Sequence, residues 1–90
     1  MAELKKIKER IQELVERKEN VTLSEIQWVV DRLSEHGYRT TERRATHGKL
    51  FGVGSTRFLV NCHDRGNKQV KSYSVQAFAS AMIHLKLYED

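Results

Sequence analysis

The sequence predicts one α+β domain over residues 1–90, in the order helix, helix, three antiparallel strands, helix. Three stretches with apolar residues at helical spacing surround a central stretch that is rich in β-forming residues. Within that central stretch, Gly54-Ser55 separates two apolar runs. Glycine at the first position of a two-residue loop is typical of a type II′ hairpin. Because each helix has one apolar side, we expect the helices to pack on one face of the sheet.

Residues 2–18 are predicted to form an amphipathic helix. Its apolar residues recur at steps of three and four and make a narrow stripe: Leu4, Ile7, Ile11 and Leu14. Such a stripe can dock on its own chain or form a short coiled coil with a second copy. We expect docking, which makes residues 1–20 an accessory helix on a core of residues 22–88. The alternative is a homodimer through residues 4–14 and Trp28.

The second helix is predicted to begin at Leu23 and to end just before Gly37. Thr22 and Glu25 have the spacing of a capping box, in which each side chain accepts a hydrogen bond from the backbone of the other residue. Gly37 supplies the left-handed residue that commonly ends a helix. The core face is formed by Ile26, Val29, Val30 and Leu33. Trp28 falls on the opposite side, where we expect the first helix to cover it.

Three strands are predicted between the second and third helices. Residues 38–44 carry charged side chains on both faces, which is typical of an edge strand. The second strand is expected to begin within residues 45–51, with His47 near its start, and the third is expected to cover residues 57–62. The turn pairs Val53 with Thr56, Phe51 with Phe58, Lys49 with Val60, and His47 with Cys62. One face of this hairpin is apolar, and the other is mixed.

A basic connector and a broadly apolar helix are predicted to complete the chain. Residues 64–67 have the composition of a turn, and residues 68–73 form the connector. Ser74 is expected to cap a helix over residues 75–88. Apolar residues cover a wide face of this helix, which should therefore be the most buried: Val75, Phe78, Ala79, Met82, Ile83 and Leu85.

Composition favours a cytoplasmic protein. No stretch approaches the roughly 20 apolar residues of a membrane helix. The chain is charged from Glu3 onward, so we expect neither a signal peptide nor an anchor. The single cysteine, Cys62, excludes an internal disulfide and suits a reducing compartment.

The positive charge is concentrated in one segment. Residues 38–73 contain eight Lys or Arg against two Asp or Glu, whereas the segments before and after each carry one net negative charge. A basic sheet region between nearly neutral helices is typical of a polyanion-binding protein, although an ordinary solvated surface is the alternative. The predicted nucleic-acid-binding residues are Arg43, Arg44, Lys49, Arg57, Arg65, Lys68 and Lys71.

Four short motifs carry a family resemblance. They are His36-Gly37-Tyr38 after the second helix, Ala45-Thr46-His47 before the second strand, Val60-Asn61-Cys62-His63 at the end of the third strand, and Ser74 before the last helix. Over residues 24–87 the chain thereby resembles the HicA family of bacterial toxins. These toxins are ribonucleases that act on messenger RNA, and their fold is similar to the double-stranded-RNA-binding domain.

The resemblance implies a metal-independent endoribonuclease with an antitoxin partner that covers the basic face. His47 stands in the place of the family's catalytic histidine, and His63 would support it. The chain departs from the pattern at Ala45, where the family has glycine, and at Gly48, where a second histidine is common. The predicted helix over residues 2–18 has no counterpart in the typical short toxin.

Such an enzyme would cleave RNA through the RNA's own 2′-hydroxyl group. One group takes the proton from the 2′-hydroxyl, and a second protonates the leaving 5′-oxygen. Histidine suits both roles because its pKa lies near working pH. In an antiparallel hairpin the start of the second strand lies beside the end of the third, so His47 and His63 should share one rim of the sheet.

Two other functions stay open on the sequence alone. One is a non-catalytic RNA- or DNA-binding module on the same fold, and the other is a protein-interaction domain that dimerises through its first helix. Cys62, His47 and His63 lack the spacing of a zinc motif, so we expect no metal and no other cofactor.

Overall fold

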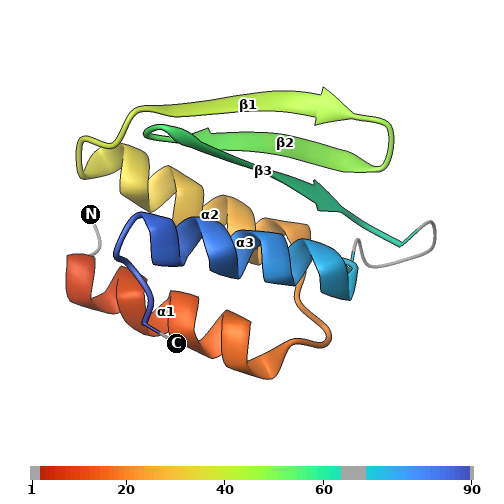
Figure 1. Ribbon diagram of the computed structural model, residues 1–90, viewed down its shortest axis with the longest axis horizontal. Helices are drawn as coiled ribbons and strands as arrows, with labels where there is room; N and C mark the ends of the chain where they lie inside the picture. Colours follow the sequence, from red (N-terminus) through yellow and green to blue (C-terminus); the bar gives the residue numbers. More distant parts are fainter. Residues whose placement is uncertain (1–2, 64–68, 90) are drawn as a thin grey trace.

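The fold has three layers: a three-stranded sheet, a pair of helices under it, and a third helix behind that pair (Figure 1). The computed structural model describes residues 3–63 and 69–89. The elements are α1 (Leu4–Arg17), α2 (Leu23–Glu35), β1 (Thr40–Ala45), β2 (Gly48–Val53), β3 (Thr56–Asn61) and α3 (Ser72–His84). This order confirms the predicted α+β fold. Helices α2 and α3 lie on one face of the sheet, and Figure 1 shows no described helix over the opposite face.

Helix α1 docks on its own chain, as expected from its narrow stripe. Ile7, Ile11 and Leu14 are fully buried, and α1 packs against both α2 and α3. The helix ends at Arg17 because Lys18 is left-handed (φ 59°) and its N–H bonds to the Leu14 carbonyl. Full burial of one such aliphatic side chain stabilises a fold by about 1.5–3 kcal/mol. Helix α1 is therefore part of the core and more than an accessory.

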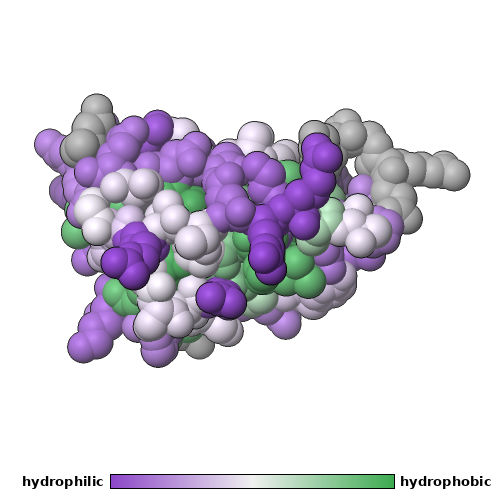
Figure 2. Space-filling view, turned by 90° about the horizontal axis from the view of Figure 1, so that it is seen from above, coloured by the Kyte–Doolittle hydropathy of each residue, from purple (hydrophilic) through white to green (hydrophobic). Residues whose placement is uncertain are grey.

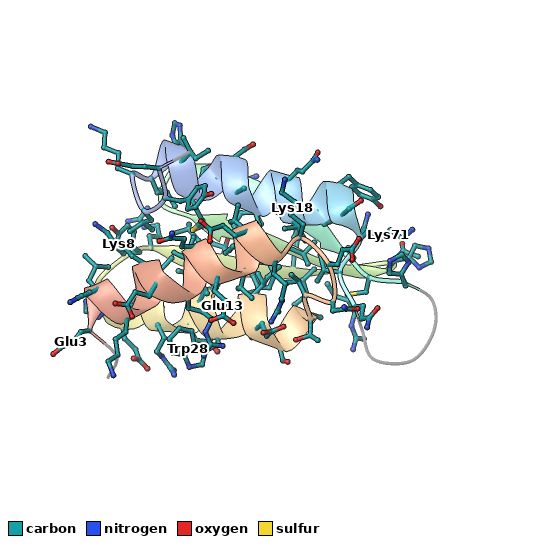
Figure 3. The ribbon with its side chains drawn as sticks, turned by 90° about the horizontal axis from the view of Figure 1, so that it is seen from below. Glu3, Lys8, Glu13, Lys18, Trp28 and Lys71 are labelled. Atoms are coloured by element: carbon teal, nitrogen blue, oxygen red, sulfur yellow. The ribbon has the colours of Figure 1, made fainter. Side chains whose placement is uncertain are left out.

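Trp28 lies in the groove between α1 and α2, where the first helix was expected to cover it (Figure 3). The Arg10 guanidinium of α1 lies 5.2 Å from the centroid of the Trp28 ring, and that of Arg32 lies 5.7 Å from it. Cations at these distances interact favourably with an indole ring. A homodimer through residues 4–14 and Trp28 would require α1 to leave these contacts.

Substitution of a buried α1 residue tests whether this helix belongs to the core. We expect Ile11→Ala to lower the free energy of unfolding by about 2–5 kcal/mol, because it leaves a cavity between packed helices. Gln12→Ala changes an exposed residue of the same helix and should cost less than about 0.5 kcal/mol. Urea denaturation followed by Trp28 fluorescence measures both values. Equal losses for the two variants would contradict the docking of α1.

The predicted capping box starts α2. Thr22 Oγ1 accepts from the N–H of Glu25 at 3.3 Å, and a Glu25 carboxylate oxygen accepts from the N–H of Thr22 at 3.0 Å. The guanidinium of Arg17 donates to the same carboxylate at 2.6 Å. Burial by itself would raise the pKa of Glu25, but the hydrogen bonds from Arg17 and Thr22 outweigh it and hold that pKa below its usual range.

The depressed pKa of Glu25 makes part of the stability dependent on pH. An ionised Glu25 stabilises the folded chain above its unfolded-state pKa of about 4.5, and this contribution is lost as the pH falls through the lower folded-state pKa. We expect Glu25→Gln to destabilise the protein by about 0.5–1 kcal/mol at neutral pH and by nothing in strong acid. Urea denaturation at both pH values, with the exposed Glu9→Gln as control, measures the difference. A loss that persists unchanged in acid would show that charge is not its source.

The sheet has the order β1-β2-β3, with both pairs antiparallel. The predicted hairpin register is confirmed for Val53 with Thr56, Phe51 with Phe58, and Lys49 with Val60. Gly54 in the turn has φ +60°, a conformation that favours glycine. The first strand lies at an edge as expected, but it begins two residues later than predicted and extends to Ala45. The second strand begins only at Gly48, because Thr46 and His47 form the turn between β1 and β2.

The core is centred on Phe58, between the sheet and α3. Its ring stacks on that of Phe51 at 5.6 Å between centroids, and it meets the ring of Phe78 edge-on at 5.7 Å. Helix α3 buries the predicted Val75, Phe78 and Met82, whereas Ile83 is exposed. The helix begins at Ser72, earlier than expected, and ends at His84 instead of position 88.

Candidate nucleic-acid interface

His47 is exposed in the two-residue turn between β1 and β2. Its carbonyl accepts a hydrogen bond of 2.7 Å from the N–H of Cys62, which continues the ladder between β2 and β3 by one pair. Cys62 is buried, and the next residue, His63, is exposed. The predicted pairing of His47 with Cys62 is thus present, and it brings His47 and His63 to the same end of the sheet. We call this end the rim: Thr46, His47, Cys62 and His63.

The chain returns to the rim after residues 64–68, which lie outside the described part. The N–H of His63 bonds to the Gln69 carbonyl at 2.9 Å, and Cys62 forms an isolated antiparallel bridge with Val70. On its other side, the N–H of Val70 bonds to the carbonyl of Val21 at 2.7 Å. The connection between α1 and α2 therefore lies next to the rim, although it is far away in sequence.

Ser74 joins the start of α3 to the end of β3. It was predicted to cap the helix, but it lies inside the first turn, and Lys71 is the residue that precedes the helix without a capping side chain. Ser74 is fully buried, and its hydroxyl accepts a hydrogen bond of 2.9 Å from the N–H of Asn61. Asn61 is at the edge of the sheet, so its outward N–H needs a partner when buried. The N–H of Lys71 completes the junction by bonding to the Asn61 carbonyl.

Removal of the Ser74 hydroxyl tests this junction. Ser74→Ala leaves the N–H of Asn61 without its acceptor, which should lower the free energy of unfolding by about 1–3 kcal/mol. Ser80→Ala removes an exposed hydroxyl from the same helix and is the matched control. Urea denaturation of both variants, with hydrogen exchange at the Asn61 amide, measures the effect. Wild-type protection of that amide in Ser74→Ala would show that the bond is dispensable.

Gly48 follows His47 and leaves no room for a side chain. A Cβ atom at this position would lie 1.8 Å from the carbonyl oxygen of Val60, which is far inside van der Waals contact. The φ of Gly48 is not positive, so the close approach of β3 is what requires glycine. This backbone therefore excludes a second histidine directly after His47.

No protein-family model, curated protein or solved structure matches the chain. Its function must therefore be inferred from its own residues. None of the helices within residues 3–63 and 69–89 is long and apolar enough to cross a membrane. Over the same ranges, no group of three His, Cys, Asp or Glu side chains is arranged to hold a metal ion.

The predicted basic residues divide between the two faces of the sheet. Arg43 and Arg57 project from the uncovered face, because they alternate with residues that pack on the helices. Arg44 and Lys49 are register partners and project from the helix side. Lys49 Nζ donates to Gln27 Oε1 at 2.8 Å and lies 3.7 Å from a carboxylate oxygen of Glu42. Lys49 is thus already part of a polar cluster over α2. Arg65 and Lys68 lie outside the described residues.

The uncovered face combines cations with apolar side chains. Arg43, Leu50 and Leu59 are neighbours in one row across the three strands, and Arg57 lies in the next row. Leu59 is 40% exposed, so an apolar side chain meets solvent on this face. The strands contain one carboxylate, Glu42, and it projects from the opposite face. Figure 2 views the molecule from the sheet side and shows hydrophilic and hydrophobic residues next to one another.

Two residues near the rim were not predicted from the sequence as part of a site. Lys18 lies at the end of α1, and Tyr73 lies in the first turn of α3. Tyr73 is 53% exposed, and its hydroxyl oxygen accepts a hydrogen bond of 3.0 Å from Asn61 Nδ2. The alternation of Lys71 and Tyr73 was a weak local signal for Tyr73. No local pattern in the sequence links Lys18 with Tyr73, because residues 18–20 and 69–73 come together only in the folded chain.

Proposed function

We propose that this protein is a HicA-like toxin of a toxin–antitoxin pair, an endoribonuclease that cleaves messenger RNA without a metal ion. The observation that carries the proposal is the exposed His47 at the rim, joined through its carbonyl to the end of β3, where His63 also lies. An imidazole can serve as the base or as the acid of RNA cleavage. The order of α2, three strands and α3 also matches what the resemblance implies.

In the proposed reaction, His47 acts on the 2′-hydroxyl or on the leaving oxygen. The base takes the proton of the 2′-hydroxyl, whose oxygen attacks the adjacent phosphorus. The bond from phosphorus to the 5′-oxygen breaks, and the acid returns a proton to that oxygen. The products are a 2′,3′-cyclic phosphate and a free 5′-hydroxyl. We assign the second proton transfer to His63, which is exposed at the same end of the sheet as His47.

Cations around the rim would bind the phosphates of the RNA. Lys71 lies at the start of α3, and Arg43 and Arg44 lie near the end of β1 that leads into the His47 turn. Charge of this kind attracts RNA of any sequence and neutralises phosphates. We further propose that an antitoxin covers the rim and the uncovered sheet face, and that the protein acts in the cytoplasm, where messenger RNA lies.

A non-catalytic RNA- or DNA-binding module on the same fold is the second candidate. Gly48 favours it, because the family commonly has a second histidine there and this backbone admits no side chain. Binding through Arg43, Arg57 and Lys71 does not require proton transfer. A dimerisation domain has less support, because the apolar stripe of α1 is already buried within the chain.

Substitution of His47 separates cleavage from binding. We expect His47→Ala to slow RNA cleavage by about 10²–10⁴-fold, because one positioned proton-transfer group is lost. RNA affinity and thermal stability should stay near wild type, because the side chain is exposed and binding comes from several cations. Single-turnover cleavage of a labelled messenger RNA in the presence of EDTA measures the rate.

The control is His84→Ala, which removes another exposed histidine, at the end of α3. It should cut at the wild-type rate. If the wild-type protein binds RNA but does not cleave it, the non-catalytic binding module is the better description of its function. Cutting that survives His47→Ala unchanged would remove His47 from the mechanism.

A further inference from the structure

A depression of about 590 Å³ adjoins the rim at the start of α3. Three segments that are distant in sequence line it: residues 18–20, His63, and residues 69–73. The side-chain oxygen of Asn20 accepts a hydrogen bond of 3.3 Å from Gln69 Nε2, and this bond ties the first segment to the third. The depression is therefore formed by segments that meet only in the folded chain.

An exposed aromatic ring forms part of this depression. Tyr73 presents about half of its surface to solvent, although the protein buries all three of its phenylalanine rings. Its hydroxyl is held by Asn61 Nδ2, and Asn61 is itself anchored through its backbone to Ser74 and Lys71. The ring is therefore exposed and oriented at the same time. A ring in this state is a platform on which a nucleic-acid base can stack at little entropic cost.

Cations lie next to this ring. Lys71 Nζ lies 5.9 Å from the centroid of the Tyr73 ring, and Lys18 lines the same depression, whose wall also contains His63. Figure 3 shows Lys18 and Lys71 toward the same end of the molecule, with Lys8 toward the other. Glu19 is the one carboxylate among the described residues that line the depression. The wall therefore favours an anion, and the ring favours a flat apolar group.

We infer that this depression is a nucleotide subsite for single-stranded RNA, in which one base stacks on Tyr73 and its phosphate lies between Lys71, Lys18 and His63. The inference rests on the proposed function, because it places this nucleotide next to the bond that His47 cuts. Stacking and charge together are how single strands are held without regard to sequence. An acidic peptide would use the cations but would leave the ring without a partner. His63 borders both the rim and the depression, so the two sites are continuous.

The test uses the full chain with His47→Ala, so that the RNA stays intact during the measurement. The probe is a short, unstructured, fluorescein-labelled RNA, and anisotropy measures its affinity. Tyr73→Ala should weaken binding about 10-fold, within the range that removal of a stacking ring produces. Tyr73→Phe keeps the ring but loses the hydroxyl bond that orients it, so it should lose clearly less affinity than Tyr73→Ala. Inorganic polyphosphate has no bases, so its affinity should be the same for all three proteins.

The lysines are tested by salt dependence. Lys71→Ala should reduce the slope of log affinity against log salt by about 0.7, the value for one phosphate of a single strand. Lys8→Ala removes an exposed lysine of α1 and should leave the slope unchanged. Tyr73→Ala should lower the affinity without changing the slope, because the ring carries no charge.

Three results would overturn the subsite. Tyr73→Ala that binds RNA as tightly as the parent would exclude stacking. Tyr73→Phe that loses as much affinity as Tyr73→Ala would show that the hydroxyl, and not the ring, matters. Equal slopes for Lys71→Ala and the parent would place the phosphate elsewhere. Cleavage by protein with His47 intact is a separate readout. RNA binding that depends on Tyr73, with no cleavage, would support the subsite and contradict the proposed ribonuclease activity. Cleavage together with RNA binding that does not depend on Tyr73 would support the ribonuclease and contradict the subsite.

Discussion

Val70 joins the end of the sheet, the start of α3 and the connection between the first two helices. Its side chain is buried, its N–H bonds to the Val21 carbonyl, and it bridges to Cys62 on the other side. A buried amide without a partner costs as much as a lost hydrogen bond, so these three segments are held in one arrangement. The backbone bonds of Val70 and its neighbours also fix the positions of His63 and Lys71. The candidate site therefore rests on buried backbone.

The surface charge follows from strand geometry more than from composition. Successive residues of a strand point to opposite faces, so Arg43 and Arg44 are neighbours in sequence and are separated by the sheet. Lys49 faces Gln27 and Glu42 and helps to position the sheet over α2. The number of cations that can bind a polyanion together is thus smaller than the basic segment suggests. Among the residues that the structure describes, the remaining cations are on the uncovered face and near the rim.

Helix α1 connects stability with the candidate site. It covers α2 and α3 on the side away from the sheet, where their apolar residues would otherwise meet water. Its last turn also carries Arg17, which bonds to the capping carboxylate of α2, and it leads into Lys18 at the depression. Residues 4–17 are therefore integral to this domain.

The sequence by itself determined the fold class, the stripe of α1, the capping box of α2 and the hairpin register. These features are local, because helical spacing, a capping pair and a two-residue turn each act within a few residues. Three features depend on the tertiary structure. His47 lies in a turn at one end of the sheet instead of inside a strand, and Ser74 accepts a hydrogen bond from β3 instead of capping α3. Lys18 and Tyr73, which are far apart in sequence, line the same depression. A serine hydroxyl can cap a helix or accept from a neighbouring strand, and only the approach of β3 selects between them. Periodicity likewise shows which side of an element is apolar, but it does not show which distant segment will cover that side.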